Sequence, residues 1–354
     1  MQIIPQSYIA VDIGSSSIKM LELQGKTSKS LASIGLQIIP EGVVSEEGIG
    51  DDSLVSEILK EMCSKMNIAP FGRSVALSLN STIGNIFKVY VDTTTELLED
   101  IIPFVAEQHF QDDMANIYYK YYPLSPEVQD NPCCEVLLVG ANREHIDQRI
   151  NILNSIGFKV AVIDSDICCL SNILEYNYDV QNVNTILINI GFNVSQLILL
   201  QNGKYTYSKE IKFGSATYTK NIMDNMDTNF ENAEILKLSA SVSDNDTVKN
   251  IISTLNEQLC VEIQDVISTF INESLSQSKN DCPTQYDQIF ILGGGSRALN
   301  LDNCMASVFK LPVKSLNPFN RIAVNESKFD IKYLIDQGHN FGVACGLALR
   351  SKTF

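Results

Sequence analysis

The chain has 354 residues, enough for two or three domains with well-developed cores. Its hydrophobic fraction of 45% is typical of a globular protein, and its net charge of −16 argues against general nucleic-acid binding, which needs clustered Lys and Arg. No apolar run of about 18 residues occurs, so no membrane-spanning helix is expected, and Met1–Ser7 is too short and uncharged for a signal peptide. Three isolated histidines and nine cysteines without CxxC spacing exclude a zinc site, and the scattered cysteines predict buried free thiols of a cytoplasmic protein.

The first predicted elements form a β-hairpin. Apolar strands at Tyr8–Ile13 and Ile18–Leu23 flank a turn of glycine and serines. A strand at Leu31–Ile39, a helix at Val55–Met66 and a buried strand at Val75–Leu79 are expected to follow.

A separate module is predicted from Gly84 to Ser155, with the order β-α-β-β-α. Its elements are a strand at Ile86–Val91, a helix at Thr95–Phe110, strands at Ile117–Tyr122 and Glu135–Ala141, and a helix at Arg143–Ser155. The pattern at Thr95 predicts a capping box, and the polar stretch Ser125–Pro132 predicts an exposed loop.

The second half repeats the opening hairpin. A strand at Lys159–Ile163 and a helix at Asp166–Glu175 lead to Tyr176–Asn184, whose Asn and Asp content predicts a domain boundary. Strands at Thr185–Ile190 and Gln196–Leu200 then flank a second glycine turn, about 180 residues after the first. The repeat predicts two duplicated α/β domains. The remaining predicted elements are a strand at Lys204–Lys212, helices at Ser215–Met226, Ala233–Ala240 and Asp244–Ser278, a strand at Tyr286–Leu292, and helices at Ala298–Lys310 and Gly338–Leu349.

The segment Asp12–Lys19, with the sequence DIGSSSIK, carries the richest set of chemical groups. Gly14 permits a positive φ or a close backbone approach, and the three serines offer amides and hydroxyls to an anion. Asp12 can hold hydrated Mg²⁺, and Lys19 can meet a phosphate. An ordinary β-turn with a polar tip is the competing interpretation.

Two further glycine turns follow strands. Asn189–Ser195 repeats the first hairpin. A single hairpin of this kind is weak evidence for a ligand-binding turn, so the evidence here comes from the repetition. At Gly293–Ser296, consecutive glycines after a strand allow a flat ring or a phosphate to approach the backbone, and the N-terminus of the expected helix adds positive potential. Neither GxGxxG nor GxxxxGK[ST] occurs, which argues against Rossmann and P-loop sites.

In this order and spacing, the three turns resemble the phosphate-1, phosphate-2 and adenosine motifs of the actin, Hsp70 and hexokinase superfamily. Within it the chain resembles the PilM family of type IV pilus assembly proteins over nearly its whole length. The matching segments are Asp12–Lys19, Leu21–Leu23, Pro40–Val44, Val162–Asp166, Glu210–Gly214 with Thr219, Gly293–Ser296 and Asn317–Phe319.

The resemblance implies an α/β actin-like ATPase fold with four subdomains. The first domain (subdomain 1A) would comprise residues 1–84, 156–180 and 321–354, and residues 85–155 would form an inserted partner-binding subdomain, 1C. Residues 181–320 would form the second domain (2A), with 2B at about 215–275. PilM-like proteins bind ATP between the two halves, and bind the N-terminal cytoplasmic tail of PilN, an inner-membrane protein, between 1A and 1C. The resemblance therefore implies a cytoplasmic scaffold at the inner membrane, attached through its partner and in contact with other pilus platform proteins.

Transferred to this chain, the resemblance assigns an ATP and Mg²⁺ site. Its residues are Asp12, Gly14, Ser15, Ser16, Ser17, Lys19, Asn189, Gly191, Gly214, Gly293, Gly294, Gly295 and Ser296, with Mg²⁺ held by Asp12 through water. Glu234 and Lys237 lie where a helix of the second domain meets the nucleotide in the family, but three residues apart on a helix they can equally form a surface ion pair.

One departure concerns catalysis. Members of the superfamily usually have Asp at the start of the phosphate-2 motif, where this chain has Asn189, whose neutral amide does not orient metal and attacking water as a carboxylate does. At most a slow ATPase is therefore expected. Besides Asp12, Asp164 and Asp166 lie where the superfamily often places a catalytic acid, although Asp166 can simply satisfy the amides of a helix start.

Three other functions compete with the scaffold. A sugar-type kinase of the same superfamily needs an acceptor pocket, and no acceptor-binding motif is found. FtsA ends in a basic amphipathic helix, whereas this sequence stops at Arg350–Phe354, and the cytoplasmic part of a type II secretion platform protein normally continues into a transmembrane helix.

Overall fold

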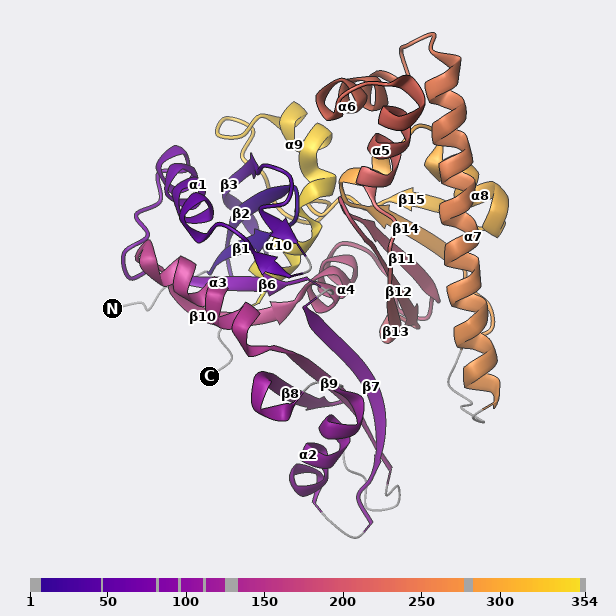
Figure 1. Cartoon of the computed structure of the whole chain (residues 1–354). Helices are drawn as coiled ribbons and strands as arrows, with labels where there is room; N and C mark the ends of the chain where they lie inside the picture. The colour runs from indigo at the N-terminus through magenta and orange to yellow at the C-terminus, as the bar shows by residue number, and fades with distance from the viewer. Residues whose placement is uncertain are drawn as a thin grey trace. The chain divides into compact units, whose positions relative to one another are not determined.

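The computed structural model describes residues 8–45, 47–80, 83–94, 97–110, 113–124, 133–276 and 283–350. Its contacts divide the chain into two compact units (Figure 1). The first unit comprises Met1–Gln24, Ala32–Cys169 and Leu347–Phe354, and the second comprises Gly25–Leu31 and Leu170–Gly346. The expected boundary at Tyr176–Asn184 lies inside the second unit, where Asn177 Nδ2 donates to Pro318 O at 3.0 Å. The four-subdomain division stays a prediction.

The first unit is built on a five-stranded sheet with the order β10-β6-β1-β2-β3. Its strands are β1 (Ile9–Ile13), β2 (Ser17–Gln24), β3 (Ser30–Ile38), β6 (Ser74–Leu79) and β10 (Lys159–Ser165). β1 pairs antiparallel with β2 and parallel with β6, which in turn runs parallel to β10. Because β1, β6 and β10 run the same way, their carboxyl ends lie along one edge of the sheet, where α/β proteins commonly bind ligands.

Two helices cover one face of this sheet. α1 (Asp52–Lys65) is capped by Asp51, whose Oδ1 accepts from Leu54 N at 2.9 Å. α1 and α3 (Arg143–Ser155) bury apolar side chains in one core with β1 and β6. The short strands β4 (Val44–Ser45) and β5 (Gly48–Ile49) form a ribbon beside them.

A second, three-stranded sheet with the order β7-β9-β8 also belongs to the first unit. Its elements are β7 (Gly84–Asp92), α2 (Leu98–His109), a 3₁₀ turn (Met114–Asn116), β8 (Ile117–Pro123) and β9 (Cys133–Asn142). α2 packs on this sheet around its own core, whereas α3 contributes Ile152, Leu153 and Ile156 to the core of the five-stranded sheet. The sequence correctly predicts the β-α-β-β-α order of this segment.

The predicted capping box of α2 is wrong. The helix begins at Leu98, and its N-cap residue is Leu97, which has no side chain that can accept a hydrogen bond. Thr95 and the predicted loop Ser125–Pro132 lie outside the described residues.

The second unit is built on another five-stranded sheet, with the order β13-β12-β11-β14-β15. Its strands are β11 (Thr185–Ile190), β12 (Ser195–Gln201), β13 (Lys204–Ile211), β14 (Gln288–Leu292) and β15 (Val313–Ser315). β11 pairs antiparallel with β12 and parallel with β14, as β1 does with β2 and β6. Starting from β3, the first sheet has the strand order β3-β2-β1-β6-β10, which corresponds strand by strand to β13-β12-β11-β14-β15 in the second sheet. This shared topology confirms the predicted duplication of an α/β domain.

Four helices pack into one core with β11, β12 and β14 (Figure 1). They are α5 (Ser215–Met226), α6 (Phe230–Ser239), α7 (Asp246–Ser276) and α8 (Leu301–Phe309). The remaining helices are α4 (Asp166–Asn177), α9 (Ile331–Gln337) and α10 (Gly342–Ala348), with a 3₁₀ turn at Gly338–Phe341 before α10. Gly342 lies so close to β14 that a Cβ there would meet Leu292 Cδ1 at 2.2 Å.

One predicted helix start is wrong where it bears on the site. The glycine turn was expected to run directly into a helix at Ala298, but it continues as a 3₁₀ turn, Gly294–Arg297. Ala298 has an extended ψ of 139°, and Asn300 has a left-handed φ of 59°, so α8 begins only at Leu301. The amides of α8 therefore do not follow the glycines directly, and the expected contribution of a helix N-terminus is absent from this turn.

Candidate functional site

The turn between β1 and β2 is closed by its own backbone. Gly14 N donates to Ser17 O at 3.1 Å, and Ser16 O accepts from Ile39 N at 3.0 Å. Gly14 does not have a positive φ, but a Cβ there would lie 3.1 Å from Lys19 Nζ and 3.3 Å from Ser17 O. Close approach is thus the physical reason for this glycine. Ser15 and Ser16 in this turn are half-buried.

Asp12 and Lys19 face each other across the β1–β2 hairpin as register partners. Lys19 Nζ lies 3.6 Å from Asp12 Oδ2 and donates to Ser17 O at 3.3 Å. Ser78 Oγ, at the end of β6, donates to Asp12 Oδ1 at 3.1 Å. A carboxylate, an ammonium group, the serine-bearing β1–β2 turn and the hydroxyl of Ser78 on β6 therefore meet at the carboxyl edge of the first sheet.

Asp164 lies on the same edge, since it is the register partner of Ser78 in the β6–β10 pair. Its Oδ2 accepts from Arg350 Nε at 2.5 Å, and its Oδ1 accepts from Ser165 N at 2.9 Å. Asp166 is the first residue of α4 and is 4% exposed. The Arg350 ion pair and the helix-start position give both carboxylates structural roles, so their catalytic assignment stays a prediction.

In the second unit, Asn189 occupies the position on β11 that corresponds to Asp12 on β1. Its Nδ2 donates to Gln196 Oε1 at 2.7 Å, and Gln196 is its register partner on β12. This bond directs Asn189 Oδ1 toward the glycine turn, where it would lie 2.5 Å from a Cβ at Gly293. The neutral amide is therefore held in a fixed orientation by a second neutral amide.

A backbone hydrogen bond connects the turn after β11 to the start of α5. Gly191 N donates to Val194 O at 3.0 Å, and Gly191 O accepts from Ser215 N at 2.9 Å. Gly214 is required by packing, because a Cβ there would come within 2.2 Å of Phe192 O. The two glycines fix the position of this turn against α5.

The glycines after β14 have different surroundings. Gly293 has a φ of 87°, and a Cβ there would lie 2.4 Å from Ile190 O, while a Cβ at Gly295 would lie 2.3 Å from Ile190 Cγ2. Ser296 Oγ donates to Gly293 O at 2.7 Å and closes the turn. Gly294 alone of the three is exposed, with only Asn340 Oδ1 within 4 Å of a Cβ, at 3.1 Å. Its open face is where a flat ring can approach the backbone.

Glu234 and Lys237 on α6 are more than a surface ion pair. Lys237 Nζ donates to Glu234 Oε1 at 2.5 Å, to Thr219 Oγ1 at 2.7 Å and to Ser215 O at 3.3 Å. Its side chain is 11% exposed, and burial lowers the pKa of its ammonium group. All three ammonium protons are thus used within the protein. Among the described residues no partner of Glu234 Oε2 is found, so this oxygen can accept from a ligand hydroxyl.

Several neighbours of the site were not predicted as site residues, although Thr219 is among the residues that carry the family resemblance. Ser78, Gln196 and Thr219 orient Asp12, Asn189 and Lys237, and His339 O accepts from Gly293 N at 3.0 Å. Burial, followed by the charge of Arg297, lowers the pKa of His339 to about 4, although Asp336 acts in the opposite direction. Besides Thr219, Gln196 had a signal available in the sequence, because an antiparallel hairpin pairs it with Asn189.

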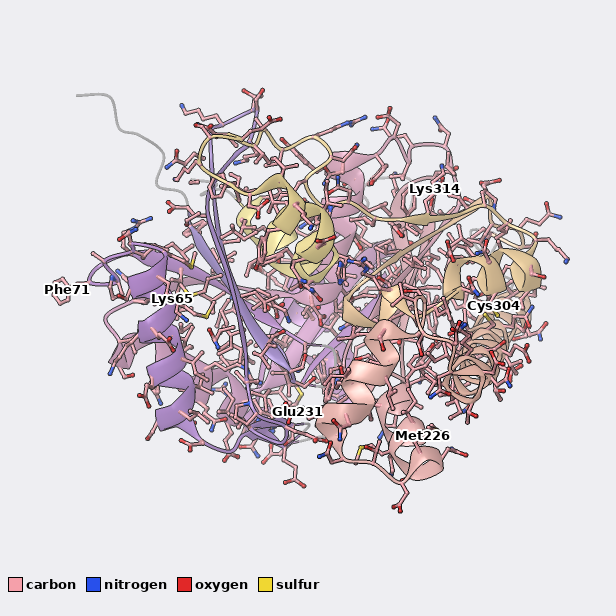
Figure 2. The ribbon with its side chains drawn as sticks, turned by 90° about the horizontal axis from the view of Figure 1, so that it is seen from above. Lys65, Phe71, Met226, Glu231, Cys304 and Lys314 are labelled. Carbon is pink, nitrogen blue, oxygen red and sulfur yellow. The ribbon has the colours of Figure 1, made fainter. Side chains whose placement is uncertain are left out.

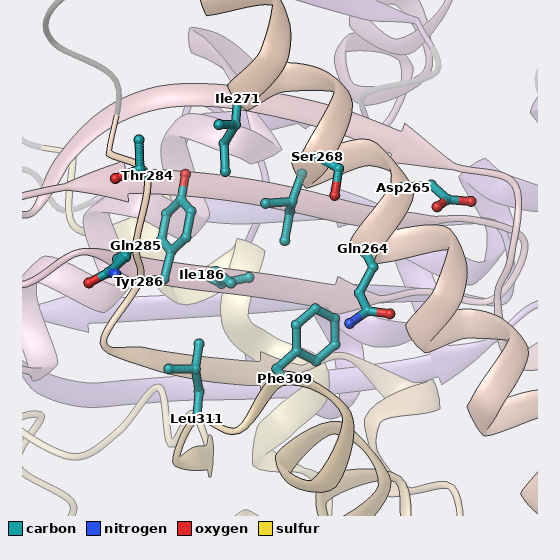
Figure 3. Close-up of a pocket in the computed structure, with 11 residues that line it drawn as sticks. Ile186, Gln264, Asp265, Ser268, Ile271, Thr284, Gln285, Tyr286, Phe309 and Leu311 are labelled. Carbon is teal, nitrogen blue, oxygen red and sulfur yellow. The ribbon is translucent and has the colours of Figure 1, made fainter. Parts of the chain in front are cut away.

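A pocket of about 710 Å³ lies elsewhere in the second unit, between α7, β11 and the segment that precedes β14 (Figure 3). Its lining combines Ile186, Ile271, Tyr286 and Phe309 with polar side chains of α7 such as Gln264. None of the predicted site residues lines it. Within the described ranges, no cluster of three or more His, Cys, Asp or Glu side chains could hold a metal ion, and no helix is long and apolar enough to cross a membrane.

Comparison with known families decides the identity of the chain. The sequence model described as "Type IV pilus assembly protein PilM" matches residues 10–352. The chain belongs to the PilM family. A solved structure described as "PilM-PilN type IV pilus biogenesis complex" is similar over 98% of this chain and 99% of that one, with a TM-score of 0.85 and 20% sequence identity. The family membership does not favour a sugar-type kinase, an FtsA-like protein or a type II secretion protein.

Other solved structures similar to this PilM-family chain share the actin-like fold. The ethanolamine utilization protein EutJ from Carboxydothermus hydrogenoformans has a TM-score of 0.60 at 12% identity, with 98% of this chain and 90% of that one covered. MreB5 of Spiroplasma citri bound to ADP has a TM-score of 0.52 at 13% identity, with 94% and 99% covered. These similarities confirm the predicted actin-like α/β fold of this type IV pilus assembly protein.

Proposed function

We propose that this PilM-family chain is an ATP-binding scaffold of the type IV pilus assembly platform. The ligand would be ATP with Mg²⁺, and the candidate residues lie at the carboxyl edge of β1 in the first unit and of β11 in the second. ADP bound to the MreB5 structure supports a nucleotide as the ligand. The donor set fits this ligand, because Lys19 and the half-buried serines suit phosphates, and the exposed Gly294 suits a flat base.

The single observation that favours binding over turnover is the bond from Asn189 to Gln196. A carboxylate at this position could orient a metal-bound water, whereas a neutral amide fixed by another amide offers no charge to it. Asp12 would hold Mg²⁺ through water, with the phosphates supplying other ligands. The nucleotide would then act mainly by stabilising one conformation of the scaffold.

We further propose that the protein partner is the N-terminal cytoplasmic tail of a PilN-like inner-membrane protein. The similar solved structure, a PilM-PilN complex, supports a PilN-like partner. A groove between subdomains 1A and 1C is the proposed site, which would place the scaffold at the cytoplasmic face of the membrane through its partner, beside other platform proteins.

Exposed apolar side chains support a partner on the inserted sheet. Among the described residues, Tyr90 on β7 and Tyr118, Tyr121 and Tyr122 on β8 are exposed, and so are Leu97 at the N-cap of α2, Phe104 on α2 and Leu124 after β8. Tyrosine is enriched in protein interfaces because its ring buries area while its hydroxyl stays hydrogen-bonded. Tyr118 joins β8 to α3, since Arg143 lies over its ring at 4.2 Å and its hydroxyl donates to Asp147 at 3.4 Å.

Titrating a synthetic PilN-like tail peptide into the full chain tests this proposal. We expect saturable binding that Tyr118→Ala weakens by about tenfold, the size typical of an interface residue that contributes more than 1 kcal/mol. Phe71→Ala is the matched control, because Phe71 is 92% exposed, its ring points into solvent, and it lies outside the strands of this sheet (Figure 2). Calorimetry that shows no saturable binding, or an equal loss in both variants, would contradict the proposed surface.

A further inference from the structure

Two cysteines in the second unit lie in direct contact. Cys260 on α7 and Cys304 on α8 have their sulfur atoms 3.8 Å apart, within reach of an S–H···S hydrogen bond. Cys260 is fully buried, whereas Cys304 is partly exposed. Figure 2 shows Cys304 on α8, beside the long helix α7. Both residues belong to the same compact unit, so the contact depends only on the packing of these two helices.

From this geometry, we propose that Cys260 and Cys304 form a peroxide-responsive modification site, in which oxidation joins α7 to α8 through a disulfide. A disulfide has an S–S distance of about 2 Å, so the sulfurs must approach by about 1.8 Å from their separation of 3.8 Å. Rotation about χ1 together with a small helix displacement can supply such a movement.

The chemistry divides between the two thiols according to their exposure. The Cys304 thiolate attacks one oxygen of hydrogen peroxide, the O–O bond breaks, and the departing hydroxide takes up a proton to give water and a Cys304 sulfenic acid. The sulfur of Cys260 then attacks Cys304 Sγ, the S–O bond breaks, and the second hydroxide leaves as water with the Cys260 proton. Two thiols are oxidised by two electrons, and one peroxide is reduced to two waters.

Burial makes Cys260 the second reactant rather than the first. Burial raises the pKa of its thiol, so little thiolate is present, and peroxide cannot reach it directly. Once Cys304 is a sulfenic acid, its electrophilic sulfur lies next to Cys260, and the high local concentration compensates for the low thiolate fraction.

The cross-link would act on a part of the fold that is already joined by buried polar contacts. Asn256, one turn before Cys260, accepts from the Tyr218 hydroxyl at 2.8 Å and donates to Leu299 O at 2.8 Å. Leu299 follows the glycine turn and precedes α8. A disulfide would close a chain segment of 44 residue steps and fix α8 more firmly against α7.

Peroxide titration of the reduced full chain, followed by alkylation, digestion and mass spectrometry, tests the proposal. The expected result is the loss of two thiols per chain, a cross-linked peptide pair containing Cys260 and Cys304, and full recovery with dithiothreitol. The oxidised protein should also unfold several degrees higher than the reduced protein. This readout needs no variant, so a substitution that impairs folding does not affect it.

Three variants separate this site from general oxidation. In Cys260→Ser, Cys304 should accumulate as a sulfenic acid that dimedone traps, and in Cys304→Ser, Cys260 should stay reduced at the same peroxide concentration. Cys168→Ser is the control, because Cys168 is also partly exposed but lies on α4, and it should form the cross-link as the wild type does. Wild-type Cys304 that ends as a sulfenic or sulfinic acid without the cross-link, or that reacts no faster than Cys168, would overturn the proposal.

Discussion

Asn189 and Gln196 form a side-chain amide pair across the β11–β12 hairpin, with Nδ2 of Asn189 2.7 Å from Oε1 of Gln196. The pair determines which atom of Asn189 faces the glycine turn, because the amide nitrogen is used by Gln196 and the oxygen remains on the side of Gly293. In the first unit, Asp12 has the corresponding place and accepts instead from Ser78. The two related hairpins therefore present a carboxylate in one unit and an oriented neutral amide in the other.

The first prediction concerns turnover. Asn189→Asp restores a carboxylate at the carboxyl edge of β11, where it can orient a metal-bound water, and should raise the Mg²⁺-dependent rate of ATP hydrolysis by about tenfold, or about 1.4 kcal/mol in the barrier. Phosphate release at saturating ATP measures the rate. Asn189→Ala is the control, since it also removes the bond to Gln196 but adds no charge. Equal rates in the two variants would show that the charge at this position does not limit hydrolysis.

The second prediction separates the glycines of the third turn. Gly294→Val places a side chain on the exposed face of the turn, where only the movable end of Asn340 lies nearby, and should weaken ATP binding at least tenfold with little change in unfolding temperature. Gly293→Val should instead destabilise the protein, because its φ of 87° and its contact with Ile190 O exclude a side chain. Thermal unfolding and ATP titration of both variants check this. Unchanged affinity in Gly294→Val would place the base elsewhere.

The third prediction tests the role of the Lys237 cluster. Lys237→Met leaves Thr219 and Glu234 without their ammonium partner, and should lower the free energy of unfolding by about 1–3 kcal/mol. Lys220→Met on α5 is the control, because Lys220 is exposed, and its effect should stay within about 0.5 kcal/mol. Urea unfolding followed by circular dichroism measures both.

Glu234→Gln keeps the size of the side chain but removes the charge of the carboxylate whose Oε2 can accept from a ligand hydroxyl. This variant should therefore mainly weaken ATP affinity, which ATP titration measures.

The fourth prediction follows from His339. Its pKa is about 4 in the folded protein, compared with 6.5 for an unperturbed histidine, so between these values the unfolded chain binds a proton that the folded chain does not. Stability therefore rises with pH across this window, and the contribution is complete above pH 6.5. The difference of about 2.5 units corresponds to at most about 3 kcal/mol.

Urea midpoints between pH 4.5 and 7 measure this contribution. His339→Gln should show a shallower rise of stability with pH than the wild type, and the pH dependence of the two proteins should be parallel above pH 7. Identical slopes below pH 6.5 would mean that other groups cause the acid sensitivity.

The sequence could predict the elements whose signal is local. α3, α5 and β11 have the predicted bounds, because each combines a clear hydrophobic period with polar or glycine residues at its ends. β15 has only three residues and two of them are exposed, so it has no such signal and forms because β14 offers an edge. The predicted helix at Ala298 fails because Asn300 adopts a left-handed conformation that propensity does not reveal.

The candidate site shows the same limit. Motifs within a few residues of one another, such as Asp12–Lys19, could be recognised from the sequence, and the structure brings these side chains together. The contact of Asp164 with Arg350 joins residues 186 positions apart, and that of Lys237 with Ser215 joins two helices. Such partners depend on packing, and they decide whether a charged residue is available to a ligand or is used within the fold.

The central claim is that the protein is an ATP-binding scaffold with little turnover. The most direct test is one titration of Mg²⁺–ATP into the wild type and into Ser16→Phe. Phosphate release is followed in the same samples. Ser16 is half-buried in the β1–β2 turn, so a bulky side chain there should block phosphates without disturbing the sheet. The account predicts saturable binding to the wild type, loss of binding in Ser16→Phe at an unchanged unfolding temperature, and phosphate release far slower than nucleotide exchange. Absence of saturable binding, equal affinity in the two proteins, or rapid multiple turnover would contradict it.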